Sequence, residues 1–129
     1  MVDRMTEEEL GALIVDAALS VHRELGPGLF ESTYEACLVY ELRSKGVEVE
    51  VQKELPIIYK GAKLDFAYRI DLLVGGKVIV ELKSVQELND QHLAQILTYL
   101  RHSQVKLGFL INFNVRLIKN GIKRIANGI

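Results

Sequence analysis

Apolar residues recur at helical spacing through the first part of the chain. Thr6 followed by Glu9 forms a capping box, and apolar residues then follow at intervals of three or four as far as Leu25. The sequence Gly26-Pro27-Gly28 ends this helix. A second helical pattern runs from about 31 to 44. The chain is therefore predicted to begin with two helices joined by a tight turn.

After the second helix the pattern changes to the alternation of strands. Val47, Val49 and Val51 alternate with polar residues, as in a half-buried strand. Asn89 can cap a later helix that runs from about Asp90 to His102. The other predicted strands are Leu55 to Lys60, Leu64 to Val74, Lys77 to Lys83 and Lys106 to Phe113. The tail after Gly121 fits either a short strand or a turn. This order predicts a mixed α/β (α+β) fold, with helices packed on a central sheet.

The composition fits one soluble domain over residues 1–129. Hydrophobic residues make up 49% and charged residues 26% of the 129, which is enough apolar material for one core and excludes wholesale disorder. We expect no membrane span, because no apolar run approaches the roughly 20 residues that one requires. The acidic N-terminus lacks the apolar region of a secretory signal, and Cys37 is the only cysteine. We therefore expect a cytoplasmic protein.

The near-neutral net charge hides a strong asymmetry. Residues 1–60 carry a net charge of −6, whereas residues 101–129 carry six basic residues and no acidic one. The basic end, which includes Lys123 and Arg124, could face a polyanion such as nucleic acid. Alternatively it could dock against the acidic front, within the chain or across a homodimer.

Three charged residues lie within two otherwise apolar strands around Gly75-Gly76, and the register of this hairpin decides whether they meet. A three-residue loop pairs Val74 with Val78, and it opposes aliphatic residues along one face as far as Ile70 and Leu82. The other face then places Asp71 opposite Glu81, with Arg69 opposite Lys83.

Two opposed carboxylates repel each other unless a cation lies between them. Hard oxygen ligands suit Mg²⁺ or Mn²⁺, and a lysine beside such an ion can orient a water molecule or hold a phosphate oxygen. Asp71, Glu81 and Lys83 therefore compose a candidate site for metal-assisted phosphodiester hydrolysis. The alternative is a surface ion-pair cluster in which Arg69 joins these three residues.

Asp71 followed by Glu81-Leu82-Lys83 resembles the signature of the PD-(D/E)XK nuclease superfamily. The segment from Gly28 through Glu31 to Tyr34 also resembles the motif of the GxxExxY family, a branch of that superfamily. Further similar segments follow in order over nearly the whole chain. Ile70 stands where the superfamily name has proline.

The resemblance implies a restriction-endonuclease-like fold and a magnesium-dependent nuclease that acts on nucleic acid, with DNA as the expected substrate. Asp71 and Glu81 would be metal ligands, together with the backbone carbonyl of Leu82, and Lys83 would be the catalytic lysine. Glu31 matches an additional acid near the metal. Gln95 and Tyr99 resemble a QxxxY element, in which Gln95 would orient the lysine or a ligand.

Several of these residues also have a simpler explanation. Glu31 at a helix start is favoured by the helix dipole. Tyr34 and His22 are candidate substrate contacts, but both lie on apolar helical patterns that are typical of core residues. Tyr99, the third such candidate on a helix, could line a cleft or a solvated edge.

Two rival functions remain open from the sequence. The chain could be a catalytically silent nuclease fold that serves as a scaffold for nucleic acid or a protein partner. It could also act on a phosphorylated small molecule, because the metal chemistry is the same. A single small domain has little surface with which to surround a duplex, so we expect a homodimer.

Overall fold

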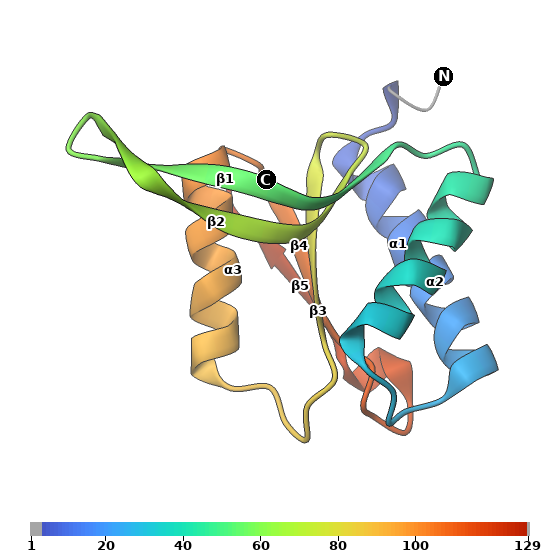
Figure 1. The fold of residues 1–129 in the computed structure, drawn as a ribbon. Coiled ribbons are helices and arrows are strands. Elements are labelled where there is room, and N and C mark those ends of the chain that lie inside the picture. Colours follow the sequence, from blue (N-terminus) through green and yellow to red (C-terminus); the bar gives the residue numbers. More distant parts are fainter. Residues whose placement is uncertain (1–3, 129) are drawn as a thin grey trace.

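The computed structural model describes residues 4–128. A five-stranded mixed sheet has the strand order β1-β2-β3-β4-β5, and only the β3–β4 pair is parallel. Its strands are β1 (Val49–Tyr59), β2 (Ala62–Val74), β3 (Val78–Lys83), β4 (Leu107–Asn112) and β5 (Ile122–Ala126). The helices are α1 (Glu7–Leu25), α2 (Glu31–Ser44), α3 (Asp90–Ser103) and the short 3₁₀ helix η2 (Ile118–Asn120). This arrangement confirms the predicted mixed sheet flanked by helices (Figure 1).

The helices form where their capping residues predict. Thr6 and Glu9 make the full capping box of α1, and Asn89 caps α3 by accepting a hydrogen bond from the His92 N–H. Helix α2 has Phe30 at its N-cap, where no side-chain hydrogen bond is made. The crossover through α3 is what allows β3 and β4 to run parallel.

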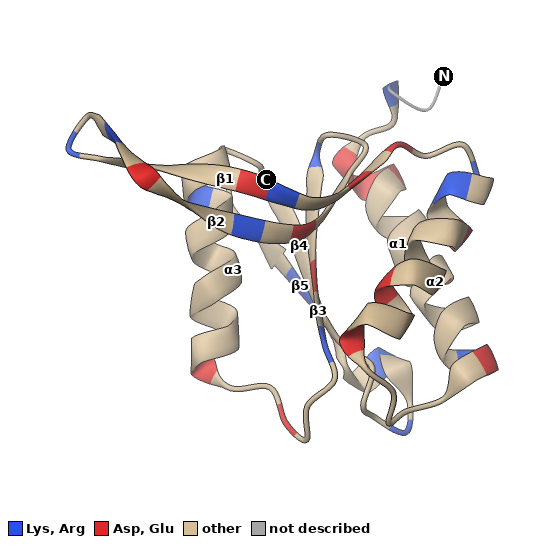
Figure 2. Ribbon diagram, in the orientation of Figure 1, with Lys and Arg blue, Asp and Glu red and all other residues tan. Residues whose placement is uncertain are grey.

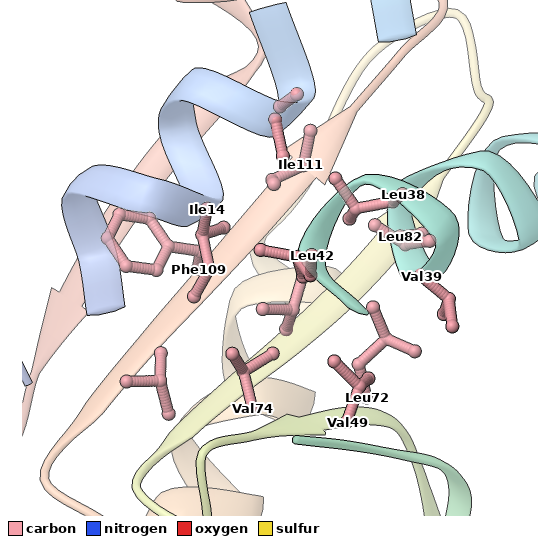
Figure 3. Close-up of a cluster of buried hydrophobic side chains, with 14 of the residues drawn as sticks. Ile14, Leu38, Val39, Leu42, Val49, Leu72, Val74, Leu82, Phe109 and Ile111 are labelled. Carbon is pink, nitrogen blue, oxygen red and sulfur yellow. The ribbon is translucent and has the colours of Figure 1, made fainter. Parts of the chain in front are cut away.

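The two faces of the sheet carry separate apolar cores. Helices α1 and α2 pack on one face, where Leu38 and Leu42 join Leu72, Val74 and Leu82 in one buried cluster (Figure 3). Helix α3 packs on the other face, where Ile96 and Leu100 join Ile70 and Ile79. The central strands β3 and β4 are therefore buried on both sides, as continuous apolar runs predict.

One strand prediction was wrong. The two strands expected at 47–52 and 55–60 are one continuous strand, β1, which pairs with β2 along its length. Gln52 has a φ of 52°, in the left-handed region, and the pairing of β1 with β2 keeps its register on both sides of it. The register shifts once, between Pro56 and Ile58. The ambiguous tail forms the edge strand β5.

The outer parts of β1 and β2, over residues 54–69, extend beyond the rest of the sheet as a two-stranded arm (Figure 1). Its exposed large apolar side chains are Ile58, Tyr59, Leu64 and Phe66. At the inner end of the arm, Tyr68 lies 5.3 Å from Tyr99 of α3, between ring centroids. The arm is thus anchored on α3 only near its base.

The turn between β2 and β3 sets the register of the candidate site, and its two glycines have different surroundings. Gly75 has a φ of 59°, and an added Cβ would lie 2.8 Å from Cδ1 of Leu10. Gly76 has a φ of 69°, with nothing within 4 Å of an added Cβ.

We expect Gly75→Ala to reduce the free energy of unfolding by roughly 2–4 kcal/mol, because backbone strain and overpacking add. Gly76→Ala is the matched control. Its free energy of unfolding should fall only by the cost of backbone strain, about 1 kcal/mol. Urea unfolding followed by circular dichroism measures both. Equal losses would contradict the close packing of this turn against α1.

Candidate active site

Strands β2 and β3 part at the two acidic residues. Their ladder of paired residues runs from Val74–Val78 to Leu72–Val80 and stops there. Beyond it, the Asp71 N–H donates to Oε2 of Glu81 at 2.8 Å, and the Leu82 N–H donates to Oδ2 of Asp71 at 2.9 Å. Each carboxylate thus takes the place of a ladder carbonyl on the opposite strand. The predicted opposition of Asp71 and Glu81 is present, and side-chain contacts hold it.

The outer part of the predicted hairpin register was wrong. Ile70 packs in the α3 core with Ile79, whereas Leu82 packs in the core under α1 and α2, so these two residues lie on opposite faces. The side-chain alternation of β2 therefore inverts at Asp71, where the strand leaves the β3 ladder. Arg69 does not lie opposite Lys83; its Nη2 is 3.7 Å from Oε1 of Glu54 on the arm.

Because of this inversion, Arg69 does not join Asp71, Glu81 and Lys83 in the predicted ion-pair cluster. Within residues 4–128, no ion pair involves Asp71, Glu81 or Lys83; the four that form all lie elsewhere. The acidic pair is held by hydrogen bonds from backbone N–H groups, and no guanidinium or ammonium group among the described residues forms an ion pair with it.

Glu81 is a carboxyl group in an apolar environment. Only 2% of its surface is exposed. Burial, followed by repulsion from the Asp71 carboxylate, raises the pKa of Glu81 from 4.5 to about 8, although the Asp71 N–H and the Lys83 ammonium act in the opposite direction. Ionisation of both the Asp71 and the Glu81 carboxyl groups is therefore unfavourable unless a cation binds beside them.

Gln52 and Glu35 also belong to the acidic side of the site, although the sequence pattern did not indicate them. Gln52 Nε2 donates both to Oδ1 of Asp71 at 3.2 Å and to Oε2 of Glu35 at 2.8 Å. Burial raises the pKa of Glu35 above its usual value, and the charges of Asp71 and Glu31 act in the same direction. The spacing of Glu31 and Glu35, four residues apart on one helix, was the signal that could have revealed Glu35.

Lys83 is held from the α3 side. Its Nζ donates to Oε1 of Gln95 at 3.2 Å, and Gln95 Nε2 donates to the hydroxyl oxygen of Tyr99 at 2.9 Å. Burial and then the charge of Glu81 raise the pKa of Tyr99, so its phenol stays protonated. The predicted contact between Gln95 and the lysine is therefore present. Tyr99 is buried and serves as the far end of this chain of hydrogen bonds.

Glu31 lies at the exposed first turn of α2, where its charge contributes to raising the pKa of Glu81. No three His, Cys, Asp or Glu side chains in the described part of the chain form a group that could hold a metal ion. The structure thus brings Glu31 toward the acidic pair but does not place it in a common ligand group with Asp71 and Glu81.

Two of the candidate substrate contacts lie in the core. Tyr34 is fully buried, and its hydroxyl donates to the Gly26 carbonyl at 2.6 Å. His22 is 8% exposed, and its Nε2 lies 2.7 Å from the Val115 carbonyl oxygen. Both side chains have their polar atoms occupied within the protein, as their apolar helical patterns indicate.

The basic tail is partly neutralised within the chain. Arg124 on β5 pairs with Glu8 on α1, which supports docking of the basic end against the acidic front. Lys123 is exposed on the same strand. Figure 2 shows acidic positions on α1, α2 and the inner parts of β2 and β3, and both acidic and basic positions along the arm.

The donor set fits a small hard cation. Asp71 and Glu81 supply two carboxylates that the strand geometry holds together and that repel each other in the absence of positive charge. Mg²⁺ is usually bound by one or two carboxylates and keeps several waters, so a third side-chain ligand is not required.

The sequence matches the model of a family described as the PD-(D/E)XK nuclease superfamily over residues 8–125. No curated protein and no solved structure matches the chain. Among the described residues, none of the helices is long and apolar enough to cross a membrane.

The raised pKa of Glu81 predicts a specific pH dependence of stability. In the unfolded chain Glu81 ionises near pH 4.5, whereas in the folded protein it keeps its proton up to about pH 8. This carboxyl therefore costs no stability below pH 4.5, and its cost grows as the pH rises toward 8.

We expect Glu81→Gln to be more stable than the unsubstituted protein in EDTA, by up to a few kcal/mol at pH 8 and by little at pH 4.5. Urea unfolding at the two pH values measures the difference. Glu87→Gln, at an exposed position, is the control and should change stability little at either pH. A gain from Glu81→Gln that does not depend on pH would contradict the burial of an acidic group.

Proposed function

Because the chain belongs to the PD-(D/E)XK nuclease superfamily, we propose that it is a Mg²⁺- or Mn²⁺-dependent nuclease that hydrolyses phosphodiester bonds, with DNA as the expected substrate. The observation that carries this proposal is the reciprocal hydrogen bonding of Asp71 and Glu81, which keeps two carboxylates together beside a lysine. A scaffold that had lost its activity would have no need to keep this unfavourable pair.

In the proposed mechanism, Asp71, Glu81 and the backbone carbonyl of Leu82 would hold the divalent ion. When bound, the ion would lower the pKa of a water molecule and offset the negative charge that grows on the phosphate. The Lys83 ammonium holds a phosphate oxygen or orients the attacking water. Gln95 positions this ammonium through its side-chain oxygen, and Tyr99 fixes the orientation of the Gln95 amide.

The acids of α2 have a separate proposed role. Glu35 shares Gln52 with Asp71, so it helps to fix the orientation of the Asp71 carboxylate. Glu31 is exposed at the mouth of the site and would contact the bound ion through water. Lys123, which is exposed on β5, would contact the nucleic-acid backbone.

The GxxExxY branch is part of the same proposal, and each of its three motif residues has a structural reason. Gly28 has a φ of 93°, which favours glycine. The Tyr34 hydroxyl fastens the loop that precedes α2. The charge of Glu31 contributes to raising the pKa of Glu81.

The homodimer remains a prediction. Its support is the arm, where Ile58, Leu64 and Phe66 are exposed. A two-stranded ribbon with an apolar surface is marginally stable by itself and is stabilised by packing against a partner surface.

Substitution of the lysine and of the glutamine that holds it should reduce cleavage to different degrees. We expect Lys83→Ala to lower kcat for Mg²⁺-dependent DNA cleavage by at least about 10²–10³-fold. Gln95→Ala should lower it by roughly 10–100-fold, because the ammonium is retained but no longer held. The matched control is Gln91→Ala, at an exposed position of α3, which should cleave at the normal rate. Cleavage that survives both Asp71→Ala and Lys83→Ala would refute the mechanism.

Metal binding should stabilise the fold independently of any substrate. Mg²⁺ at about 100 times its Kd should raise the free energy of unfolding by about 2.7 kcal/mol, and EDTA should reverse the gain. Asp71→Asn should abolish this response. Asp65→Asn, an exposed acid on the arm, should respond like the unsubstituted protein. Thermal unfolding across a Mg²⁺ titration gives the comparison, and an equal response of all three proteins would place the ion elsewhere.

A further inference from the structure

The loop between α1 and α2 is fixed in place before any substrate arrives. The Tyr34 hydroxyl donates to the Gly26 carbonyl at 2.6 Å and accepts from the Leu29 N–H at 3.1 Å. The ring of Tyr34 stacks on Phe113, with 4.4 Å between centroids and 9° between planes. The buried tyrosine thus ties both ends of the loop to the core of the protein.

The same loop is fastened to the candidate active site. Ser84 directly follows Lys83, and its Oγ donates to the Leu29 carbonyl at 2.6 Å. On the other side of Phe30 stands Glu31, whose charge reaches Glu81. Phe30 therefore lies between Leu29, which is hydrogen-bonded to the residue after the candidate catalytic lysine, and Glu31, whose charge acts on the candidate metal ligand Glu81.

Phe30 itself is 83% exposed, more than any other large apolar residue among those that the structure describes as exposed. It occupies the N-cap of α2, where its side chain makes no capping hydrogen bond. Helix stability would favour Ser, Thr, Asp or Asn at this position. Neither the core nor the helix thus accounts for an aromatic ring held in solvent at the rim of the site.

We propose that Phe30 stacks on a nucleobase next to the scissile phosphate and that the substrate is unpaired at the cleaved position. This inference rests on the proposed nuclease function and names its substrate class. Within a duplex, both faces of a base are covered by its neighbours, so a protein ring reaches a base face only where the strand is single or opened. Proteins that bind single strands use aromatic side chains in this way, and the stacking tolerates any base sequence.

The chain contains no tryptophan, which allows a direct test of stacking. Phe30→Trp introduces the single tryptophan of the chain, whose emission is followed apart from that of the five tyrosines. Lys83→Ala in the same chain slows cleavage during the measurement. With Mg²⁺ present, a single-stranded oligonucleotide should quench this fluorescence. The same oligonucleotide with abasic sites should quench it much less, and so should a blunt duplex. The control is Tyr40→Trp in the same background, an exposed position on α2, whose fluorescence should stay unchanged.

A second measurement uses cleavage by the otherwise unsubstituted chain. Phe30→Ala should raise KM for a single-stranded substrate by about tenfold or more, and the duplex should be affected less. Tyr40→Ala should leave both unchanged. Equal quenching by intact and abasic strands, or an unchanged KM in Phe30→Ala, would overturn the stacking role.

The outcomes also separate this inference from the function on which it rests. If the unsubstituted chain cleaves nucleic acid but Phe30→Trp is not quenched, only the stacking role fails. If the fluorescence changes with protein concentration alone, Phe30 belongs to an interface between copies and the inference is overturned. If no nucleic acid is cleaved under any condition, the nuclease function fails, whatever the quenching shows.

Discussion

The backbone N–H groups of Asp71 and Leu82 have lost their ladder partners, and two carboxylates replace them. The candidate site depends on this exchange, because buried N–H groups require acceptors. Asp71 reaches across to β3 and Glu81 reaches back to β2, so the two acids cannot move apart without leaving a donor unpaired. The fold thereby keeps two carboxyl groups together, and burial, followed by repulsion from the Asp71 carboxylate, raises the pKa of Glu81 to about 8.

The two cores on either side of the sheet make this exchange possible. Leu72 packs under α1 and α2, whereas Ile70 packs under α3. The side chains of β2 must therefore change from one face of the sheet to the other at Asp71. Each layer then supplies its own support. Helix α2 and strand β1 orient Asp71 through Glu35 and Gln52, and α3 orients Lys83 through Gln95. The site is therefore rigid on both sides before it binds an ion or a substrate.

The sequence predicted the part of the site that local aliphatic pairing determines. The pairs Val74–Val78 and Leu72–Val80 fixed the register and so brought Asp71 and Glu81 together. Helix ends were equally predictable, because capping residues such as Thr6 and Asn89 act locally. The match over residues 8–125 agrees with the superfamily that the acidic and lysine motif suggested.

The other features of the site depend on contacts between segments that are distant in the sequence. The spacing of apolar and polar residues along the chain does not reveal such contacts. The inversion at Asp71 follows from packing Ile70 against α3, a contact between different elements. Gln52 lies in a stretch whose alternation predicts an ordinary strand, but its φ is in the left-handed region, and its amide joins Glu35 to Asp71. Tyr34 has a motif position that suggested chemistry, yet its hydroxyl holds a loop.

The most direct test of the account is a crystal structure of the protein soaked with Mn²⁺, in which the anomalous signal locates the ion. The account predicts one Mn²⁺ that contacts the carboxylates of both Asp71 and Glu81 at the point where β2 and β3 part. An ion bound elsewhere would contradict this prediction. The absence of an ion between the two carboxylates at saturating Mn²⁺, with both still hydrogen-bonded to the backbone N–H groups, would contradict it as well.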